Sequence, residues 1–367
     1  MRGSVAAFTD TYLPTVNGVS YTVATWRERW RARGGQMAVV YPRTEREPES
    51  REYPVSSLPF PVYDGYRFSP PIVPESLDAD LVHAHTPFGI GIAALRFARS
   101  KELPLIRSYH TPIEEYATYL SPPDSLLPEL RWGCRRYERW FLEKAERIIA
   151  PSETTRNHLR SDLGVTGPVE VISNGVDTDF FRPVISDIRD RYGLESGPLI
   201  GYTGRHGHEK NLDELLDAVS ETDWTLALAG DGPAQPALDA KASRLDIDVR
   251  FLGFLDREEL PEFYSALDVF AFPSPVETEG LVAREAIACG TPVIGADAGA
   301  LSETVVDGET GYHYTPGDPV GFRRAIARAL AERDHLKNGC LAERESISVE
   351  RSIDRLETVY NSVERTL

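Results

Sequence analysis

The segment VFAF-PSPVETEG-LVAREA, residues 269–286, contains the pattern that decides the fold. An apolar run, Val269–Phe272, is followed by a loop and then by a helical pattern that begins near Gly280. A short apolar run that leads into a helix is typical of a β-α unit in a parallel sheet. Glu277 in the loop and Glu285 in the helix, with seven residues between them, place two carboxylates just beyond the end of this strand.

The same alternation of short apolar runs and helical patterns extends over almost the whole chain. The predicted strands are Val5–Phe8, Ala38–Tyr41, Leu81–His85, Leu105–Tyr109, Arg147–Ala150, Val169–Ile172, Leu199–Thr203, Thr225–Ala229, Val249–Leu252, Val269–Phe272 and Pro292–Gly295. Two such series predict two doubly wound α/β domains, residues 1–180 and 190–345, joined between Asp177 and Pro198. A last helix, about 349–364, lies in a segment, 346–367, that we expect to pack back toward the first domain.

The composition is that of a globular protein with an unusual charge balance. The chain has 367 residues, 41% hydrophobic, with 57 acidic against 40 basic side chains, and five of the basic side chains are lysines. The net charge of −17 argues against non-specific nucleic-acid binding, which needs a basic surface. We interpret this charge as adaptation to high salt. A merely acidic protein from an arginine-favouring genome is the alternative.

Membrane-spanning and metal-binding patterns are missing from the sequence. No stretch approaches the roughly 20 apolar residues that span a bilayer, and the N-terminus leads directly into the first strand. We therefore expect a cytoplasmic protein without a signal peptide. The three cysteines are too scattered for a zinc cluster or a disulfide framework.

Two further loops have features of phosphate-binding sites. The loop after the first strand, TDTYLPTVNGV (residues 9–19), ends in Asn17-Gly18, and a glycine at a helix N-terminus lets backbone amides approach an anion. Residues 204–211, GRHGHEKN, place Arg205 and Lys210 between a strand and a helix, where both suit phosphate oxygens. An ordinary turn is the alternative in each case. The glycine fingerprint GxGxxG is absent, which disfavours a nicotinamide enzyme.

Taken together, these motifs resemble those of the retaining glycosyltransferases of family 4, which have the GT-B fold of two Rossmann-like domains facing a central cleft. Glu277 and Glu285 look like the Glu-x7-Glu motif of that family. The other matching segments are FTDTYLP (8–14) with Asn17-Gly18, YHTP (109–112), NGVD (174–177), GR (204–205) with KN (210–211), GDGP (230–233), FLGF (251–254) and GTPV (290–293). The resemblance covers nearly the full chain.

The resemblance implies a role for residues in both domains. Arg205 and Lys210 would bind the donor diphosphate, Glu277 the hydroxyls of the transferred hexose, and Glu285 the ribose. The backbone of Glu279, Gly280 and Leu281 would contact sugar and phosphate, and that of Gly253, Phe254 and Leu255 the base. Gly18 would let its loop close on the phosphate, and His110 would contact the donor sugar near the reaction centre. Glu279 replaces an aromatic residue or glutamine that is frequent in the family, which predicts a more acidic surrounding of the sugar.

The implied chemistry requires neither cofactor nor metal. Glycosyl transfer builds negative charge on the departing phosphate, and Arg205, Lys210 and helix N-termini supply positive charge there. The phosphate itself would accept the proton of the acceptor, with Asp10 and His110 as alternative acid/base residues. Three metal-like patterns are interpreted as structural: Asp78-Ala79-Asp80, the pair His83 and His85, and the pair His206 and His208.

Two helices hint at a lipid acceptor and at contact with the inner face of the membrane. Trp26 and Trp30 lie among arginines in residues 25–33, and Trp132 and Trp140 lie among arginines in residues 131–141. Basic helices with tryptophan suit a lipid interface, although each pair would equally suit a protein core. HTPIEEY (110–116) also looks like family members that glucosylate diacylglycerol or related lipids.

Other functions remain open at this stage. Within the enzyme class, the acceptor could be a soluble or polyprenyl-linked glycan, or the chain could be a GT-B sugar-phosphate synthase or phosphorylase. A nucleotide-sugar-binding regulator is the non-enzymatic alternative. The sequence does not distinguish a UDP- from a GDP-hexose donor.

Overall fold

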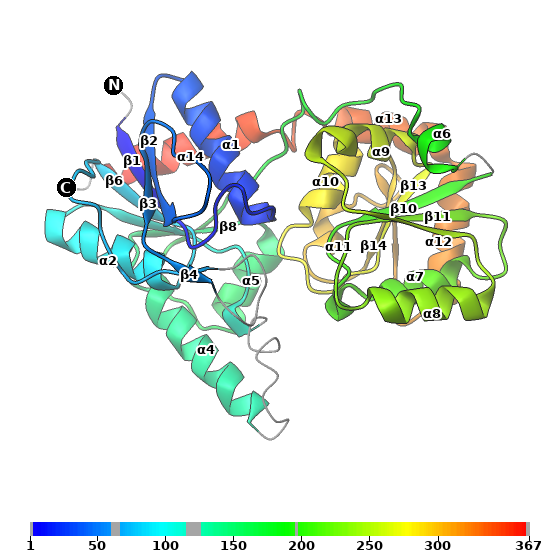
Figure 1. Ribbon diagram of the computed structural model, residues 1–367, viewed down its shortest axis with the longest axis horizontal. Helices are drawn as coiled ribbons and strands as arrows, with labels where there is room; N and C mark the ends of the chain where they lie inside the picture. Colours follow the sequence, from blue (N-terminus) through cyan, green and yellow to red (C-terminus); the bar gives the residue numbers. More distant parts are fainter. Residues whose placement is uncertain (1–2, 60–66, 115–125, 195–196, 365–367) are drawn as a thin grey trace. The chain divides into compact units, whose positions relative to one another are not determined.

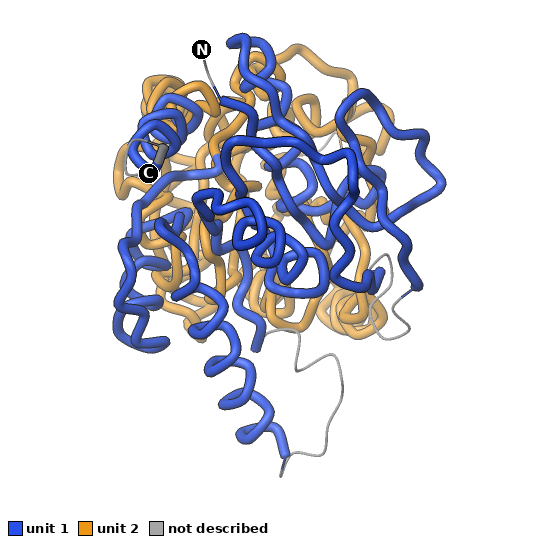
Figure 2. Tube along the Cα trace, turned by 90° about the vertical axis from the view of Figure 1, so that its left-hand side faces the viewer, with its two compact units in different colours: residues 1–174, 352–367 blue, residues 175–351 orange. Residues whose placement is uncertain are grey.

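The computed structural model describes residues 3–59, 67–114, 126–194 and 197–364, which form two compact units. Unit 1 contains residues 1–174 and 352–367, and unit 2 contains residues 175–351 (Figure 2). The division at Asn174 and Gly175 lies earlier than the predicted join, because Val176, Phe181 and Ile188 pack into the core of unit 2.

Unit 1 is built on a seven-stranded parallel sheet in the order β3-β2-β1-β6-β7-β8-β9. These strands are β1 Ser4–Phe8, β2 Gln36–Pro42, β3 Glu52–Val55, β6 Leu81–Ala84, β7 Leu105–Ser108, β8 Arg147–Ala150 and β9 Val169–Val171. A separate antiparallel pair consists of β4 Leu58–Pro59 and β5 Arg67–Phe68. The helices are α1 Gly18–Ala32, α2 Gly89–Lys101, α4 Leu127–Leu142, α5 Glu153–Ser161 and, from Ser352 onward, α14 Val349–Glu364.

Side chains alternate between the two faces of the unit 1 sheet, and each face packs against different helices. Val82 and Ala84 of β6 join the core that includes α2. His83, on the opposite face, contacts Trp26 of α1 and Tyr360 of α14. The predicted last helix therefore packs on the first domain, as expected.

Unit 2 is built on a six-stranded parallel sheet in the order β12-β11-β10-β13-β14-β15, with helices on both faces (Figure 1). Its strands are β10 Leu199–Thr203, β11 Thr225–Ala229, β12 Val249–Gly253, β13 Val269–Phe272, β14 Val293–Ala296 and β15 Gly311–Tyr314. Its helices are α6 Ile188–Tyr192, α7 Leu212–Val219, α8 Gln235–Leu245, α9 Leu260–Ala266, α10 Leu281–Ala288, α11 Leu301–Thr304, α12 Pro319–Ala331 and α13 Arg333–Ala342. Two 3₁₀ turns, His208–Lys210 and Arg257–Glu259, complete it.

Each sheet has one place where the strand order changes direction. In unit 1, the first strand, β1, lies between β2 and β6, and in unit 2 the first strand, β10, lies between β11 and β13. Connections leave in opposite directions on the two sides of such a strand, and ligands of α/β sheets bind there, beyond the carboxyl ends of the strands. The loops after β1, β6, β10 and β13 are therefore where a ligand is expected to bind.

Candidate active site

The loops after β10 and β13 bring the predicted donor-binding residues of unit 2 together. Lys210 follows β10 and Glu277 follows β13, and these strands are neighbours in the sheet. Lys210 Nζ lies 2.6 Å from Glu277 Oε1, and both side chains are mostly buried. Burial lowers the pKa of Lys210, but the Glu277 carboxylate outweighs burial, so the pKa is raised and the ammonium stays charged. Arg205, in the same loop as Lys210, lies 3.9 Å from Glu209.

Gly280 makes the turn between the Glu277 loop and α10. Its φ of +75° is a left-handed conformation, and an added Cβ would lie 2.7 Å from Leu301 Cδ2. A side chain at this position would therefore be both strained and obstructed. The glycine lets α10 begin at Leu281, as predicted, and the first backbone N–H groups of a helix have no partner within the helix. Such an N-terminus favours anionic or polar ligand oxygens.

Glu285, in α10, is held by a residue that the sequence analysis missed. The Tyr264 hydroxyl, from α9, donates a hydrogen bond of 2.7 Å to Glu285 Oε2. Burial raises the pKa of Glu285 to about 7, although the Tyr264 hydrogen bond and Arg257 lower it. No sequence signal distinguishes Tyr264 from the other aromatic residues of the core.

The Glu279 side chain is buried beside Arg284 and does not face solvent. It is 2% exposed, and Oε1 lies 3.6 Å from Nε of Arg284. Its backbone carbonyl accepts a hydrogen bond of 2.8 Å from Thr304 Oγ1. The acidic character expected from Glu279 is thus offset by Arg284 within the core of unit 2.

The loop after β12 carries the residues predicted to meet the base. Phe254 is exposed, whereas Leu255 belongs to the core of unit 2. The carbonyl of Gly253 accepts a hydrogen bond of 2.7 Å from Gly230 N, which ties this loop to the end of β11. An aromatic ring on a fixed loop suits stacking with a nucleobase.

The remaining predicted residues, Gly18 and His110, lie in unit 1 at the carboxyl ends of its strands. Gly18 is the first residue of α1, and the side chain of Asn17 caps this helix by accepting a hydrogen bond of 2.9 Å from Ser20 N. His110 follows β7, and its Nε2 lies 3.1 Å from Nδ1 of His85. Burial lowers the pKa of His110 to about 4, so this imidazole is neutral at neutral pH.

Asp10, the alternative acid/base residue, is engaged in the structure of unit 1. Its two carboxylate oxygens accept hydrogen bonds of 2.9 Å from Ile90 N, near the start of α2, and of 2.7 Å from Thr86 Oγ1. Burial raises its pKa to about 6, although these bonds lower it. The contacts make Asp10 a cap of α2.

The metal-like patterns have structural contacts. Asp80 Oδ2 accepts a hydrogen bond of 2.7 Å from Ser4 N at the amino ends of β1 and β6, away from the candidate site. The buried His206 shapes its loop, because its backbone N–H donates to the Asp231 carbonyl. Within the described residues, no group of three His, Cys, Asp or Glu side chains is arranged to hold a metal ion.

The two tryptophan pairs differ in location. Trp26 and Trp30 are 1% and 2% exposed, so of the two alternatives left open for α1 the protein core holds and the membrane does not. Trp132 and Trp140 of α4 are 64% and 42% exposed. Glu115 and Tyr116 of the HTPIEEY segment lie outside the described residues. Among the described helices, none is long and apolar enough to cross a bilayer.

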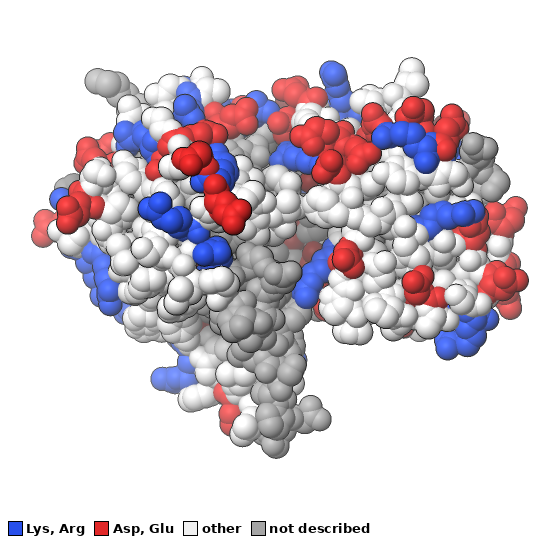
Figure 3. Space-filling view, viewed as in Figure 1, with Lys and Arg blue, Asp and Glu red and all other residues white. Residues whose placement is uncertain are grey.

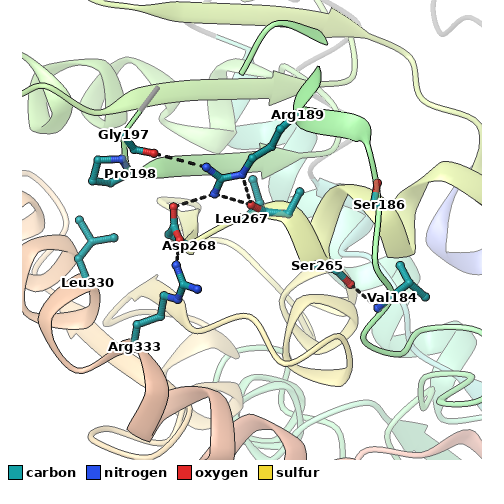
Figure 4. A pocket seen from close by; sticks show the side chains of 11 residues that line it. Val184, Ser186, Arg189, Gly197, Pro198, Ser265, Leu267, Asp268, Leu330 and Arg333 are labelled. Carbon is teal, nitrogen blue, oxygen red and sulfur yellow. Dashed lines mark hydrogen bonds and ion pairs between the residues drawn. The ribbon is translucent and has the colours of Figure 1, made fainter. Parts of the chain in front are cut away.

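An open pocket of about 710 Å³ in unit 2 lies at the opposite edge of the sheet, at the amino ends of β10 and β13 (Figure 4). Arg189 and Arg333 both point toward Asp268, and Arg189 Nη2 lies 2.8 Å from Asp268 Oδ2. The two arginines therefore share the single carboxylate of Asp268, and none of the predicted site residues lines this pocket.

Comparison with known proteins identifies the class to which this fold and site belong. Residues 184–340 match the family model described as glycosyl transferases group 1, and residues 16–180 match the model described as glycosyltransferase family 4. The chain belongs to this family of glycosyltransferases and has the GT-B fold.

Individual relatives extend over most of the chain. It is 29% identical to the alpha-monoglucosyldiacylglycerol synthase of Streptococcus pneumoniae over 365 residues. The aligned region covers 93% of this chain and 81% of the relative. It is 32% identical over 306 residues to the D-inositol 3-phosphate glycosyltransferase of Nocardiopsis dassonvillei, covering 77% of this chain and 70% of the relative. The solved structure of sucrose-phosphate synthase from Thermosynechococcus elongatus matches all of both chains with a TM-score of 0.82 at 22% identity, which shows the shared fold.

Proposed function

We propose that this glycosyltransferase moves a hexose from a UDP- or GDP-hexose to a lipid acceptor, with retention of the anomeric configuration and without a metal ion. The observation that carries the proposal is the pair of Lys210 and Glu277, 2.6 Å apart at the point where the strand order of unit 2 changes. The Lys210 ammonium suits the oxygens of a diphosphate, and the Glu277 carboxylate suits the hydroxyls of a sugar.

The pair has a direct consequence for donor binding. When the diphosphate arrives, the Lys210 ammonium exchanges Glu277 for phosphate oxygens, and the carboxylate is released to accept hydrogen bonds from the hexose. Arg205 adds a planar guanidinium that suits a second phosphate oxygen. Because the ion pair holds both side chains in place before the donor binds, little reorganisation is needed at the reaction step.

The transfer step balances without a side-chain nucleophile. The bond between the anomeric carbon and the diphosphate oxygen breaks, and the acceptor hydroxyl oxygen attacks on the same face. The acceptor proton passes to the departing phosphate oxygen, whose negative charge Arg205, Lys210 and the α10 N-terminus stabilise. Attack from the face of the leaving group yields retention.

A lipid acceptor and peripheral contact with the inner face of the membrane are supported by α4. The helix carries exposed Trp132 and Trp140 together with exposed arginines, and it extends away from the sheet of unit 1 (Figure 1). These exposed residues are Arg131, Trp132, Arg135, Arg136, Arg139 and Trp140. Tryptophan and arginine together suit an anionic lipid surface. The S. pneumoniae relative is itself named for a glucosylated diacylglycerol product.

The test is donor turnover by the purified protein. A panel of UDP- and GDP-hexoses is offered with a chelator, with and without membrane lipid extract, and released nucleotide is measured. We expect lipid-dependent release that survives the chelator. Release without lipid would reject the lipid acceptor, loss with the chelator would reject metal independence, and no release from any donor would favour a nucleotide-sugar-binding regulator.

A further inference from the structure

Two histidines at the carboxyl end of β6, His83 within the strand and His85 just after it, are not used by the transfer chemistry above. His83 and His85 lie on the same face of the sheet, with ring centroids 4.2 Å apart, and both are buried. His85 is the one whose Nδ1 lies 3.1 Å from Nε2 of His110. The rings of His85 and His110 are nearly coplanar, with an interplanar angle of 16°.

The geometry points to His85 as a positioning residue that fixes the ring plane and the proton position of His110. This inference rests on the proposed function and on the role that the family resemblance gives His110, which is contact with the donor sugar near the reaction centre. A hydrogen bond along the line between the two nitrogens restrains rotation of the His110 ring. Because an imidazole has two different nitrogens, the same bond couples the tautomers of the two rings: if His110 Nε2 donates, His85 Nδ1 accepts, and if His85 Nδ1 donates, the hydrogen of His110 is on its Nδ1.

The electrostatic environment makes this bond well defined. Burial lowers the pKa of His110 to about 4 and that of His85 well below its usual value. Both rings are therefore neutral at neutral pH and carry one N–H each, so in the 3.1 Å contact one of the facing nitrogens donates and the other accepts. Two charged rings would repel each other. If neither facing nitrogen carried a hydrogen, two lone pairs would point at each other without a hydrogen bond.

His85 is itself held rigidly. His83 packs against its ring, with ring centroids 4.2 Å apart and an interplanar angle of 31°, and an aromatic ring at position 83 is enough to keep this contact. The hydrogen bonds of His83 are made elsewhere: Nδ1 lies 2.7 Å from the Tyr360 hydroxyl and Nε2 lies 2.9 Å from Ser108 Oγ. Trp26 contacts His85 edge-on, with ring centroids 5.8 Å apart. A ring fixed on both sides transmits a fixed orientation to its hydrogen-bond partner, which is what a precise contact with substrate requires.

The test compares substitutions at His85 with a matched substitution at His83. In His85→Phe, a ring remains but the nitrogen is lost. In His85→Asn, an amide atom lies near the position of Nδ1 and can bond His110. His83→Phe makes the same change two residues earlier on the same buried face, where it removes two hydrogen bonds without touching the bond to His110.

We expect His85→Phe to lower kcat by about 10- to 100-fold, the scale of a misplaced reacting group, with the donor KM changed less than about threefold. His85→Asn should recover kcat to within about fivefold of the wild type. His83→Phe should lower the melting temperature while kcat stays within about threefold of the wild type. An unchanged kcat in His85→Phe, or an equal fall of kcat in His83→Phe, would overturn the inference.

A second measurement does not depend on activity. Nitrogen–proton correlation spectra of the imidazoles in the wild type should show one tautomer of His110 at pH 7, and the spectrum of His85→Asn should keep it. A mixture of tautomers in the wild type would also reject the positioning role. Failure of the wild type to turn over any donor would instead reject the proposed function, so the two failures are distinguishable.

Discussion

Lys210 gives the most direct residue-scale prediction. Lys210→Ala removes the cation that faces the leaving diphosphate, and we expect kcat to fall by about 10²- to 10³-fold, the usual cost of deleting one preorganised donor of this kind. Lys241→Ala is the matched control, because Lys241 Nζ forms an ion pair of the same length, 2.6 Å, with Asp217 outside the site. Nucleotide release is measured for both variants. Wild-type turnover by Lys210→Ala would contradict the assigned role.

Glu285 predicts a pH dependence of donor binding. Burial raises its pKa to about 7, so the carboxylate that would accept the ribose hydroxyls is increasingly protonated as the pH falls through 7. The donor KM should rise by up to about tenfold between pH 8 and pH 6, since one pKa unit corresponds to a tenfold change. Glu285→Gln imitates the protonated form, and its KM should be high and independent of pH. An equal pH slope in Glu285→Gln would assign the dependence to another group.

At the residue scale, the sequence predicted which residues form the candidate site but not which of them are in contact. The residue types of Lys210, Glu277 and Glu285 identified them as candidates, but the contact between Lys210 and Glu277 links positions 67 residues apart. That contact depends on β10 and β13 being neighbours, which a local pattern does not specify. Tyr264 was missed, and His85 was considered only as a possible metal ligand, for the same reason: the role of a buried aromatic residue or histidine depends on its partner, which the local pattern does not show.

At the scale of elements, the strands that sequence reasoning missed are explained by their position. All eleven predicted strands are present with bounds within two residues. Of the four missed strands, β4 and β5 have two residues each, and β3 and β15 are edge strands, which pair with one neighbour only. β3 contains Pro54, and β15, GYHY, lacks an aliphatic run, so neither has the pattern of a strand buried on both sides.

The helix α4 makes a prediction about membrane binding. Trp132→Ser with Arg136→Ser removes one exposed aromatic and one exposed basic residue four positions apart, and Arg136 lies 5.2 Å above the Trp132 ring. We expect the affinity for vesicles of anionic lipid to fall by about tenfold or more, since each arginine near such a surface contributes about 1 kcal/mol and the tryptophan adds apolar burial.

The matched control for α4 lies on a helix of unit 2. Val320 and Arg324 of α12 are also exposed and four positions apart, so Val320→Ser with Arg324→Ser likewise removes one exposed apolar and one exposed basic residue, but no tryptophan. Its vesicle affinity, measured by sedimentation, should equal that of the wild type. Equal losses in both double variants would indicate a general charge effect and would reject α4 as the contact.

At the scale of the whole molecule, charge is the property that sequence predicts without the structure. Acidic side chains are spread over the face of unit 2 drawn in Figure 3, with fewer basic ones between them. A net charge of −17 destabilises the compact state through self-repulsion, and this repulsion reaches less far in salt because the Debye length falls from about 10 Å at 0.1 M to about 3 Å at 1 M.

Adaptation to high salt therefore predicts that potassium chloride stabilises the protein. Between 0.1 M and 1 M salt at pH 7, the melting temperature measured by calorimetry should rise by at least about 4 °C, which corresponds to a gain of roughly 1–2 kcal/mol for units of this size. At pH 5, close to the isoelectric point of about 5.0, the net charge and with it the repulsion nearly vanish, so the same addition of salt should have much less effect. A melting temperature that does not rise with salt at pH 7 would favour a merely acidic composition. An equal rise at both pH values would assign the effect to the salt's action on water and not to screening of charge.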